Sequence, residues 1–328
     1  MLVESVPNVS EGRRSEVVDR MAAAIESVPG AFLLDRTSDA SHNRSVFTLA
    51  GEHGAVADAL ERLVEVAVHD VDMELHEGEH PRIGAVDVIP FIPLGSTTIA
   101  DAIELARVFG ARIATRFDLP VFLYAKAATR ADREKLADVR RGQYEGLKAE
   151  ISQRGREPDF GPRRLHPSAG AVAVGARPFL IAYNINLESD DVELARRIAR
   201  RVRESGGGLP RLQANGFEIR EPERGHAKPR AQVSMNLLDF AVTPLWVVWE
   251  TVRDLAAQDG VRLAESELIG LAPIASLLAV ADRAGAAPGL PVEDRLRAAA
   301  DYLHLRDFTP SMALELRLET ARQAGSAP

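Results

Sequence analysis

The stretch Phe179-Leu-Ile-Ala-Tyr-Asn-Ile-Asn-Leu187 has the clearest strand pattern in the sequence, because its side chains alternate between apolar and other types. Alternate residues of a strand point to opposite faces of a sheet, so the pattern predicts a strand with one packed face. That face carries Phe179, Ile181, Tyr183, Ile185 and Leu187. The other face carries Ala182, Asn184 and Asn186. We therefore expect a sheet whose second face is polar and open to solvent or ligand.

Further strand and helix patterns on both sides of this segment predict an α+β fold. The expected strands are Leu2–Val6, Ala31–Asp35, Ser45–Ala50, Ile83–Ile92, Val121–Tyr124, Phe179–Leu187, Arg211–Glu218, Gln232–Phe240 and Val261–Ile269. The expected helices are Ser15–Ser27, Ala55–Val71, Thr98–Phe117, Asp190–Glu204, Thr243–Gln258 and Ile274–Ala284, with a helical tail, Pro291–Ala324, broken near Pro310. Thr98 and Asp101 form a capping box at the start of the third helix.

The order of these elements is β-α-β-β-α-β-α-β before about residue 130 and β-α-β-β-α-β-α in the second half. Each half contains the split βαβ pattern of ferredoxin-like folds. A single doubly wound sheet would require strict alternation of strands and helices, which is absent. We predict two related ferredoxin-like lobes, residues 1–170 and 171–328, joined by the polar stretch Arg141–Pro167. A ligand cleft or tunnel is expected between them.

Composition restricts the classes of partner. The 328 residues carry 40 basic and 48 acidic side chains, a net charge of −8, so a general nucleic-acid or membrane-surface binder is not expected. The absence of cysteine excludes disulfides, thiolate metal sites and a cysteine nucleophile. The amino terminus lacks the apolar segment of a signal peptide, and the most apolar stretch, Leu268–Ala281, is too short to span a bilayer. A cytoplasmic protein is expected.

The densest chemical feature is His76-Glu-Gly-Glu-His80-Pro-Arg82, which matches two zinc-protease patterns. Those patterns need a regular helix, whereas Gly78 weakens a helix and Pro81 biases His80 away from helical geometry. A loop with a free histidine is the favoured interpretation. A histidine titrates near neutral pH and is therefore suited to general acid–base catalysis.

Two further segments carry groups suited to an anionic ligand. Asp35–Arg44 combines acid, amide and guanidinium side chains between two strands. The Gly-rich basic run from Asp159 to Arg177 fits neither a P-loop nor a dinucleotide-binding motif. Amides on two strands of one lobe, together with Asp87 inside an apolar strand, favour a polar groove.

Seven blocks, in this order, resemble the glutamate formimidoyltransferase family, which is related to the transferase part of formimidoyltransferase-cyclodeaminase. They are Ser5-Val-Pro-Asn-Val-Ser-Glu-Gly12, Asn43-Arg-Ser-Val46, Gly78-Glu-His-Pro-Arg-Ile-Gly84, Asp87-Val-Ile-Pro-Phe-Ile-Pro93, Asp159-Phe-Gly-Pro162, Gly175-Ala-Arg177 and the strand Phe179–Leu187. Each block is weak alone, but the ordered set is specific. The blocks lie within the first 240 residues.

The resemblance implies transfer of a formimidoyl group from N-formimidoyl-L-glutamate to tetrahydrofolate in histidine breakdown, in a homodimer with a folate tunnel between two lobes. Tetrahydrofolate is then the cosubstrate and no metal is expected. The catalytic histidine corresponds to His80, and its helpers to Glu79, Asp39 and Arg44. The folate-binding run corresponds to Gly161, Pro162, Arg163, Arg164, Leu165, His166, Pro167, Ser168, Ala169 and Gly170. The substrate-binding residues that we expect are Asn8, Asn43, Arg82, Asn184 and Asn186.

Three alternatives stay open at this point. The donor could be a formyl compound, such as N-formylglutamate or 5-formyltetrahydrofolate. The chain could be a zinc hydrolase that uses His76 and His80, or a folate- or amino-acid-binding protein without catalysis. Because both expected substrates are anions, we also expect a locally positive site in this acidic chain. Its expected members are Arg44, Arg82, Arg163, Arg164 and Arg177.

Overall fold

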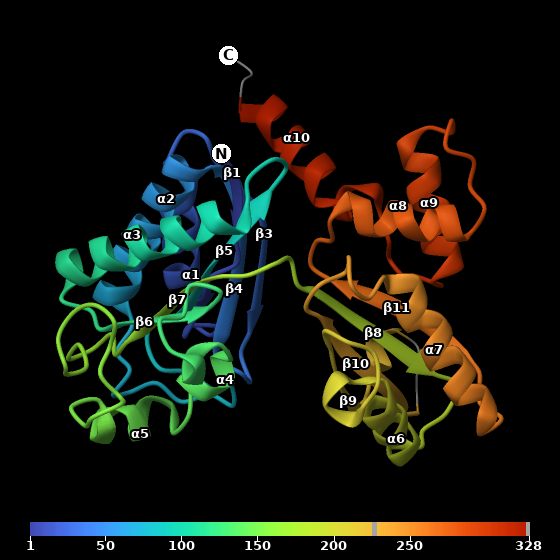
Figure 1. The fold of residues 1–328 in the computed structure, drawn as a ribbon, viewed down its shortest axis with the longest axis horizontal. Coiled ribbons are helices and arrows are strands. Elements are labelled where there is room, and N and C mark those ends of the chain that lie inside the picture. Colours follow the sequence, from blue (N-terminus) through green and yellow to red (C-terminus); the bar gives the residue numbers. More distant parts are fainter. Residues whose placement is uncertain (225–227, 326–328) are drawn as a thin grey trace. The chain divides into compact units, whose positions relative to one another are not determined.

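The computed structural model describes residues 1–224 and 228–325, which form two compact units (Figure 1). The first comprises Met1–Pro178 together with the chain from Ala321 onward, and the second comprises Phe179–Thr320. Each unit has its own sheet, of seven strands in the first and four in the second, with helices between the strands. The predicted α+β class is confirmed.

The sheet of the first unit runs in the order β3-β4-(β1, β2)-β5-β7-β6. Its strands are β1 (Leu2–Ser5), β2 (Asn8–Val9), β3 (Ala31–Asp39), β4 (Arg44–Glu52), β5 (Val86–Leu94), β6 (Val121–Ala125) and β7 (Val172–Ala176). Both β1 and β2 lie between β4 and β5 and pair antiparallel with each. The pairs β5–β7 and β6–β7 are parallel.

Strand β7 was not expected from the sequence. All five of its residues are buried, so it has no polar alternation that would mark it as a strand. Parallel strands with both faces covered commonly read as continuous apolar runs. Strand β5 also begins at Val86 rather than Ile83, because residues 76–85 belong to an irregular segment.

The helices of the first unit include α1 (Ser15–Glu26), α2 (His53–Asp70) and α3 (Ile99–Phe117). These three close the main core, which includes Phe47, Leu60 and Phe91. The capping box of Thr98 and Asp101 is present at the start of α3, as predicted. The stretch predicted as a connection instead packs within this unit. It contains α5 (Gln143–Glu150), follows the short α4 (Leu136–Val139), and buries Leu147 and Ile151 against Phe122.

The second unit has a four-stranded antiparallel sheet in the order β11-β8-β10-β9. Its strands are β8 (Ile181–Leu187), β9 (Leu212–Ile219), β10 (Arg230–Leu237) and β11 (Leu263–Ile269). Its helices are α6 (Val192–Val202), α7 (Leu245–Gln258), α8 (Ile274–Arg283), α9 (Val292–Tyr302) and the first part of α10 (Leu314–Gly325). The predicted break in the tail is confirmed by the turn Pro310–Met312.

The chain order β8-α6-β9-β10-α7-β11 is the β-α-β-β-α-β order expected for this half. In the first unit the same order appears as β1/β2-α1-β3-β4-α2-β5, followed by α3, β6 and β7. In each unit the first strand of this series lies between the third and the fourth, and the second strand lies beyond the third. Tyr183 and Ile185 point into the core of the second unit, as the alternation predicts.

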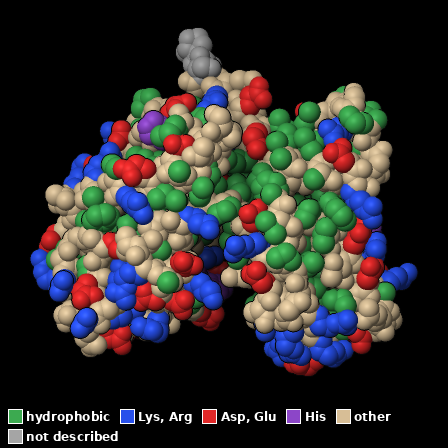
Figure 2. Space-filling view, in the orientation of Figure 1, with side chains coloured by type: hydrophobic (Ala, Val, Ile, Leu, Met, Phe, Trp, Pro, Cys, Tyr) green, Lys and Arg blue, Asp and Glu red, His purple; other side chains and the backbone are tan. Residues whose placement is uncertain are grey.

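The surface carries charges of both signs. On the face drawn in Figure 2, Lys and Arg side chains are interspersed with Asp and Glu on each unit. Among the helices of the described residues, none is long and apolar enough to cross a bilayer.

Candidate functional site

The histidine-rich segment predicted as a loop is a loop. Residues 76–83, between α2 and β5, form neither helix nor strand, so His76 and His80 do not stand on one helical face. Both ring nitrogens of His76 are used within the protein: Nε2 lies 3.0 Å from the carbonyl of Asn43, and Nδ1 accepts from Nε of Arg82 at 3.3 Å. In the described part of the chain, no three His, Asp or Glu side chains gather as a metal site would require.

The loop is fixed against the turn that joins β3 to β4. The side chain of Asn43 accepts from the N–H of Gly12 at 3.0 Å and donates to the carbonyl of Glu77 at 2.9 Å. A Cβ on Gly78 would lie 2.4 Å from the carbonyl oxygen of His42, so only glycine permits this approach. Asn43 was expected to bind substrate, but its amide is occupied in holding the loop.

His80 is half-buried in the middle of this loop. Among the described residues, no hydrogen bond to its ring is found. Burial, together with the positive charges of Arg44 and Arg140, lowers its pKa from 6.5 to about 3. The imidazole is therefore neutral at physiological pH and has a nitrogen free to accept a proton.

Arg44 and Asp39 lie at the two ends of the β3–β4 turn. Arg44 is the first residue of β4, is half-buried, and donates through Nη1 to Oδ1 of Asn8 at 3.2 Å. Asp39, the last residue of β3, accepts from the N–H of His42 at 2.9 Å and pairs with its ring at 3.0 Å. The backbone hydrogen bond from His42 is the main cause that lowers the pKa of Asp39. Glu79 is exposed beside them.

The sequence analysis did not predict that Asp87 pairs with Arg140. Asp87, the second residue of β5, is 1% exposed, and one of its oxygens accepts a hydrogen bond from Nη2 of Arg140. Arg140 ends the short helix α4. The signal available in the sequence was Asp87 itself, because a buried carboxylate requires a cationic or hydrogen-bonding partner. Nothing in the sequence pattern marks Arg140 as that partner.

Arg82 is paired within the protein, which the sequence analysis did not predict. It was expected to hold a substrate carboxylate, but it is 7% exposed and makes a two-pronged pair with Glu145 at 2.7 and 2.9 Å. Its hydrogen bond is the main cause that lowers the pKa of Glu145. In this structure Arg82 therefore ties the loop to α5 and is not free for a ligand.

The end of the predicted folate-binding run lies beside the loop of His80. The N–H of Ala85 donates to the carbonyl of Ala169 at 2.8 Å, and that of Ala171 donates to the carbonyl of Ile83 at 3.0 Å. A Cβ on Gly84 would lie 2.0 Å from the carbonyl oxygen of Ala171, so this backbone contact requires glycine.

Within the run itself, Nδ1 of His166 accepts the N–H of Ala169 at 3.0 Å, which closes a tight turn. Its earlier part lies at the end of α3, where Arg164 pairs with Asp118 at 2.6 Å. Arg163 is exposed. The run therefore extends from the C-terminal end of α3 to the base of the His80 loop.

The arginines predicted to form a positive site have different surroundings in the structure. Arg44 and Arg140 act on His80, and Arg177 hydrogen-bonds the buried Tyr124, which also feels the charge of Arg140. Arg82 and Arg164 are neutralised by carboxylates.

Asn184 and Asn186 belong to the second unit, where they donate to Glu267 at 2.9 Å and to Glu265 at 3.3 Å.

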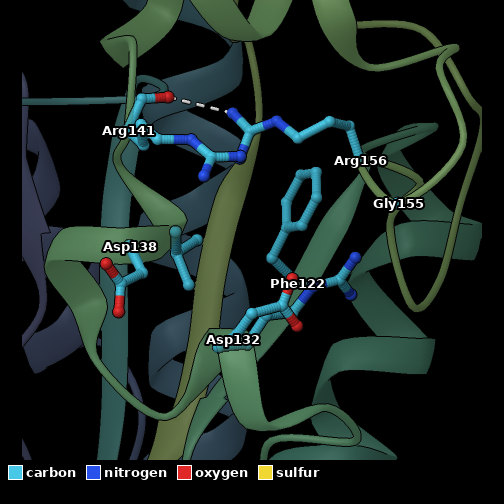
Figure 3. Close-up of a pocket in the computed structure, with 8 residues that line it drawn as sticks. Phe122, Asp132, Asp138, Arg141, Gly155 and Arg156 are labelled. Atoms are coloured by element: carbon cyan, nitrogen blue, oxygen red, sulfur yellow. Dashed lines mark hydrogen bonds between the residues drawn. The ribbon is translucent and has the colours of Figure 1, made fainter.

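A cavity of about 230 Å³ opens in the first unit and is lined in part by Asp138 and Val139 of α4 (Figure 3). The ring of Phe122 points into it, and Arg156 donates to the carbonyl of Arg141 at its edge. Ligand pockets commonly measure roughly 300–1,000 Å³, so this one is too small for a folate. Neither His80 nor the predicted folate run contributes to its wall.

Comparisons with known proteins find one family over most of the chain. Residues 2–177 match the model of the formiminotransferase domain, N-terminal subdomain, and residues 182–310 match that of the formiminotransferase domain. A glutamate formimidoyltransferase of Streptococcus pyogenes is 43% identical over 281 residues, which are 86% of this chain and 92% of that protein. One of Thermoplasma acidophilum is 40% identical over 98% of both chains. The mouse formimidoyltransferase-cyclodeaminase is 42% identical over 84% of this chain and 51% of its own length.

Proposed function

The chain belongs to the formiminotransferase domain family and is an enzyme of the glutamate formimidoyltransferase type, and we propose that His80 moves the protons of its reaction. This family transfers a formimidoyl group to tetrahydrofolate in histidine catabolism. The products are 5-formimidoyltetrahydrofolate and L-glutamate. The observation that carries the proposal for His80 is its half-buried, unengaged ring in a loop fixed from both sides.

The chemistry needs one group that accepts and then returns a proton. The N5 amine of the folate attacks the amidine carbon, a C–N bond forms, and N5 loses its proton to His80. The glutamate nitrogen then takes up a proton from the imidazolium, and the bond between that nitrogen and the amidine carbon breaks. General acid–base catalysis of this kind contributes about 10²–10⁴-fold to the rate.

In the free site, burial and the charges of Arg44 and Arg140 lower the pKa of His80, so its imidazole is neutral but a weak base. The carboxylates of a bound donor offset those positive charges and raise the pKa of His80 toward neutrality, which both proton transfers require. In this proposal Glu79 and Asp39 stabilise a positively charged amidine.

The proposal also includes the other binding residues, the lobe architecture and the oligomeric state that were predicted from the sequence. Residues 161–170 bind the folate, and Asn8 and Asn184 contact substrate. Asn186 is fully buried and paired with Glu265, and it is not part of this proposal. The two units are related ferredoxin-like lobes, and the chain acts as a homodimer without a metal. Their support is the shared strand order and the family matches.

An assay of the purified chain tests this function. Tetrahydrofolate and N-formimidoyl-L-glutamate are mixed with enzyme, and the absorbance of the formimidoyl-folate product is followed. N-formyl-L-glutamate in place of the donor tests the formyl alternative, and we expect turnover only with the formimidoyl compound. Folate binding without turnover of either donor would contradict the proposal.

A further inference from the structure

Asp87 and Arg140 form a buried ion pair that the proton transfers at His80 do not use. Asp87 lies near the start of β5, and burial raises its pKa while the charge of Arg140 opposes that rise. Its Oδ1 accepts the N–H of Ile83 at 2.9 Å, and its Oδ2 accepts from Nη2 of Arg140. The carboxylate thus holds both the end of the His80 loop and one guanidinium.

This pairing leaves donors of Arg140 unused. Its Nε is buried and, among the described residues, has no hydrogen-bond partner. The Nε of Arg44 is in the same condition. A buried donor without an acceptor is unfavourable, and its presence in two neighbouring guanidinium groups indicates a missing acceptor.

The local charge identifies the kind of acceptor. Arg44 and Arg140 both lower the pKa of His80, and the charges of both act on Asp87. Asp39 also acts on Arg44, but its side chain is 48% exposed and paired with His42, so solvent screens its charge. Asp87 is thus the buried carboxylate that faces both guanidinium groups. Guanidinium groups recognise carboxylates through paired N–H donors.

We propose that Arg140, held in place by Asp87, binds a carboxylate of the glutamate donor together with Arg44. Arg140 is thereby a substrate-recognition residue of the active site, and Asp87 is a positioning residue that acts through it. The proposal rests on the proposed function, because the carboxylate is that of N-formimidoyl-L-glutamate. It places the donor on the side of His80 that faces α4.

Steady-state kinetics of Arg140→Gln and Arg140→Lys test it. We expect Arg140→Gln to raise KM for the donor on the order of 30-fold, with a smaller change in kcat and in KM for tetrahydrofolate. Arg140→Lys keeps the charge and recovers part of the loss. The matched control is Arg141→Gln, an exposed arginine at the next position, which we expect to leave both KM values unchanged. An effect of Arg140→Gln on tetrahydrofolate alone would overturn the proposal.

A double variant separates substrate binding from simple neutralisation of Asp87. If Arg140 only balances the buried charge, Asp87→Asn combined with Arg140→Gln removes both charges and restores KM for the donor. If Arg140 binds substrate, the double variant regains stability in urea but keeps the raised KM. We expect the second result, and the first would contradict us.

Calorimetric binding of L-glutamate keeps this test independent of turnover. The wild type is expected to bind L-glutamate, and Arg140→Gln is expected to weaken that binding on the order of tenfold or more. Glutamate binding lost in Arg140→Gln supports the site even if no formimidoyl transfer is found. Equal glutamate affinity of the two proteins refutes the site even if transfer is found.

Discussion

The backbone N–H of Ile83 lies 2.9 Å from Oδ1 of Asp87, so a buried side chain of β5 fastens the loop that leads into that strand. His80 stands three residues before this attachment, and Glu77, three residues before His80, is held by Asn43. The ring of His80 is therefore carried by a short span of loop with a fixed point on each side. This explains how a segment without regular structure keeps a side chain in place.

Replacement of His80 should abolish the proton transfers. We expect His80→Asn to lower kcat on the order of 10²–10⁴-fold, because general acid–base catalysis is lost. Steady-state kinetics with the formimidoyl donor measures this. His69→Asn is the matched control, because the side chain of His69 is 87% exposed on α2 and should not affect the rate. Activity of His80→Asn within a few-fold of wild type would exclude the assignment.

The stability of the protein should fall in acid partly because of His80. Its pKa is 6.5 when unfolded and about 3 when folded, so between these values the unfolded chain binds more protons. The stabilising contribution is complete above pH 6.5 and is lost as the pH falls toward 3. Urea unfolding at a series of pH values measures this. In His80→Asn, the free energy of unfolding should depend less steeply on pH over that window, by up to one proton. An unchanged slope would show that folding does not lower the pKa of His80.

Gly78 should be intolerant of a side chain. A Cβ would lie 2.4 Å from the carbonyl oxygen of His42, so Gly78→Ala must displace the loop that carries His80. We expect kcat/KM to fall by at least tenfold, because small misplacements of reacting groups are costly. Gly54→Ala in α2 is the control, since no atom lies within 4 Å of its Cβ, and we expect normal kinetics and an equal or higher Tm. Normal activity of Gly78→Ala would show that the loop adapts.

Arg306 should support the second unit. Its side chain is 11% exposed and pairs with Glu221 at 2.8 Å, Glu265 at 3.0 Å and Glu267. Arg306→Met leaves these carboxylates short of a partner, and we expect a loss of about 3–5 kcal/mol in the free energy of unfolding. Arg297→Met, which removes only exposed pairs on α9, should cost less than about 1 kcal/mol. Equal losses in urea unfolding would contradict the special role of Arg306.

The fold could be predicted wherever one face of an element meets solvent. The strand Phe179–Leu187 and the helix that begins at Thr98 have such faces, and both are present. Strand β7 has no exposed face, so its residues give no alternation. The stretch Arg141–Pro167 is polar overall, and the few apolar side chains that it buries are too widely spaced to indicate packing.

The site was predictable where chemistry is concentrated in a short segment. His80, Glu79 and Arg44 lie in motifs with several reactive side chains. Arg140 lies 53 residues from its partner Asp87, in a region without a motif, and only the fold brings the two together. The pairing of Arg82 could not be predicted, because its partner, Glu145, lies 63 residues away in the stretch predicted as a connection.

The backbone pairing of Ile83–Ala85 with Ala169–Ala171 has a practical consequence for protein engineering. The two segments are far apart in the chain, yet each supplies the other with hydrogen-bond partners and with space for Gly84. A chimaera that imports the His80 loop from a relative must import residues 166–171 with it. The exchangeable module of this enzyme is thus a pair of distant peptides.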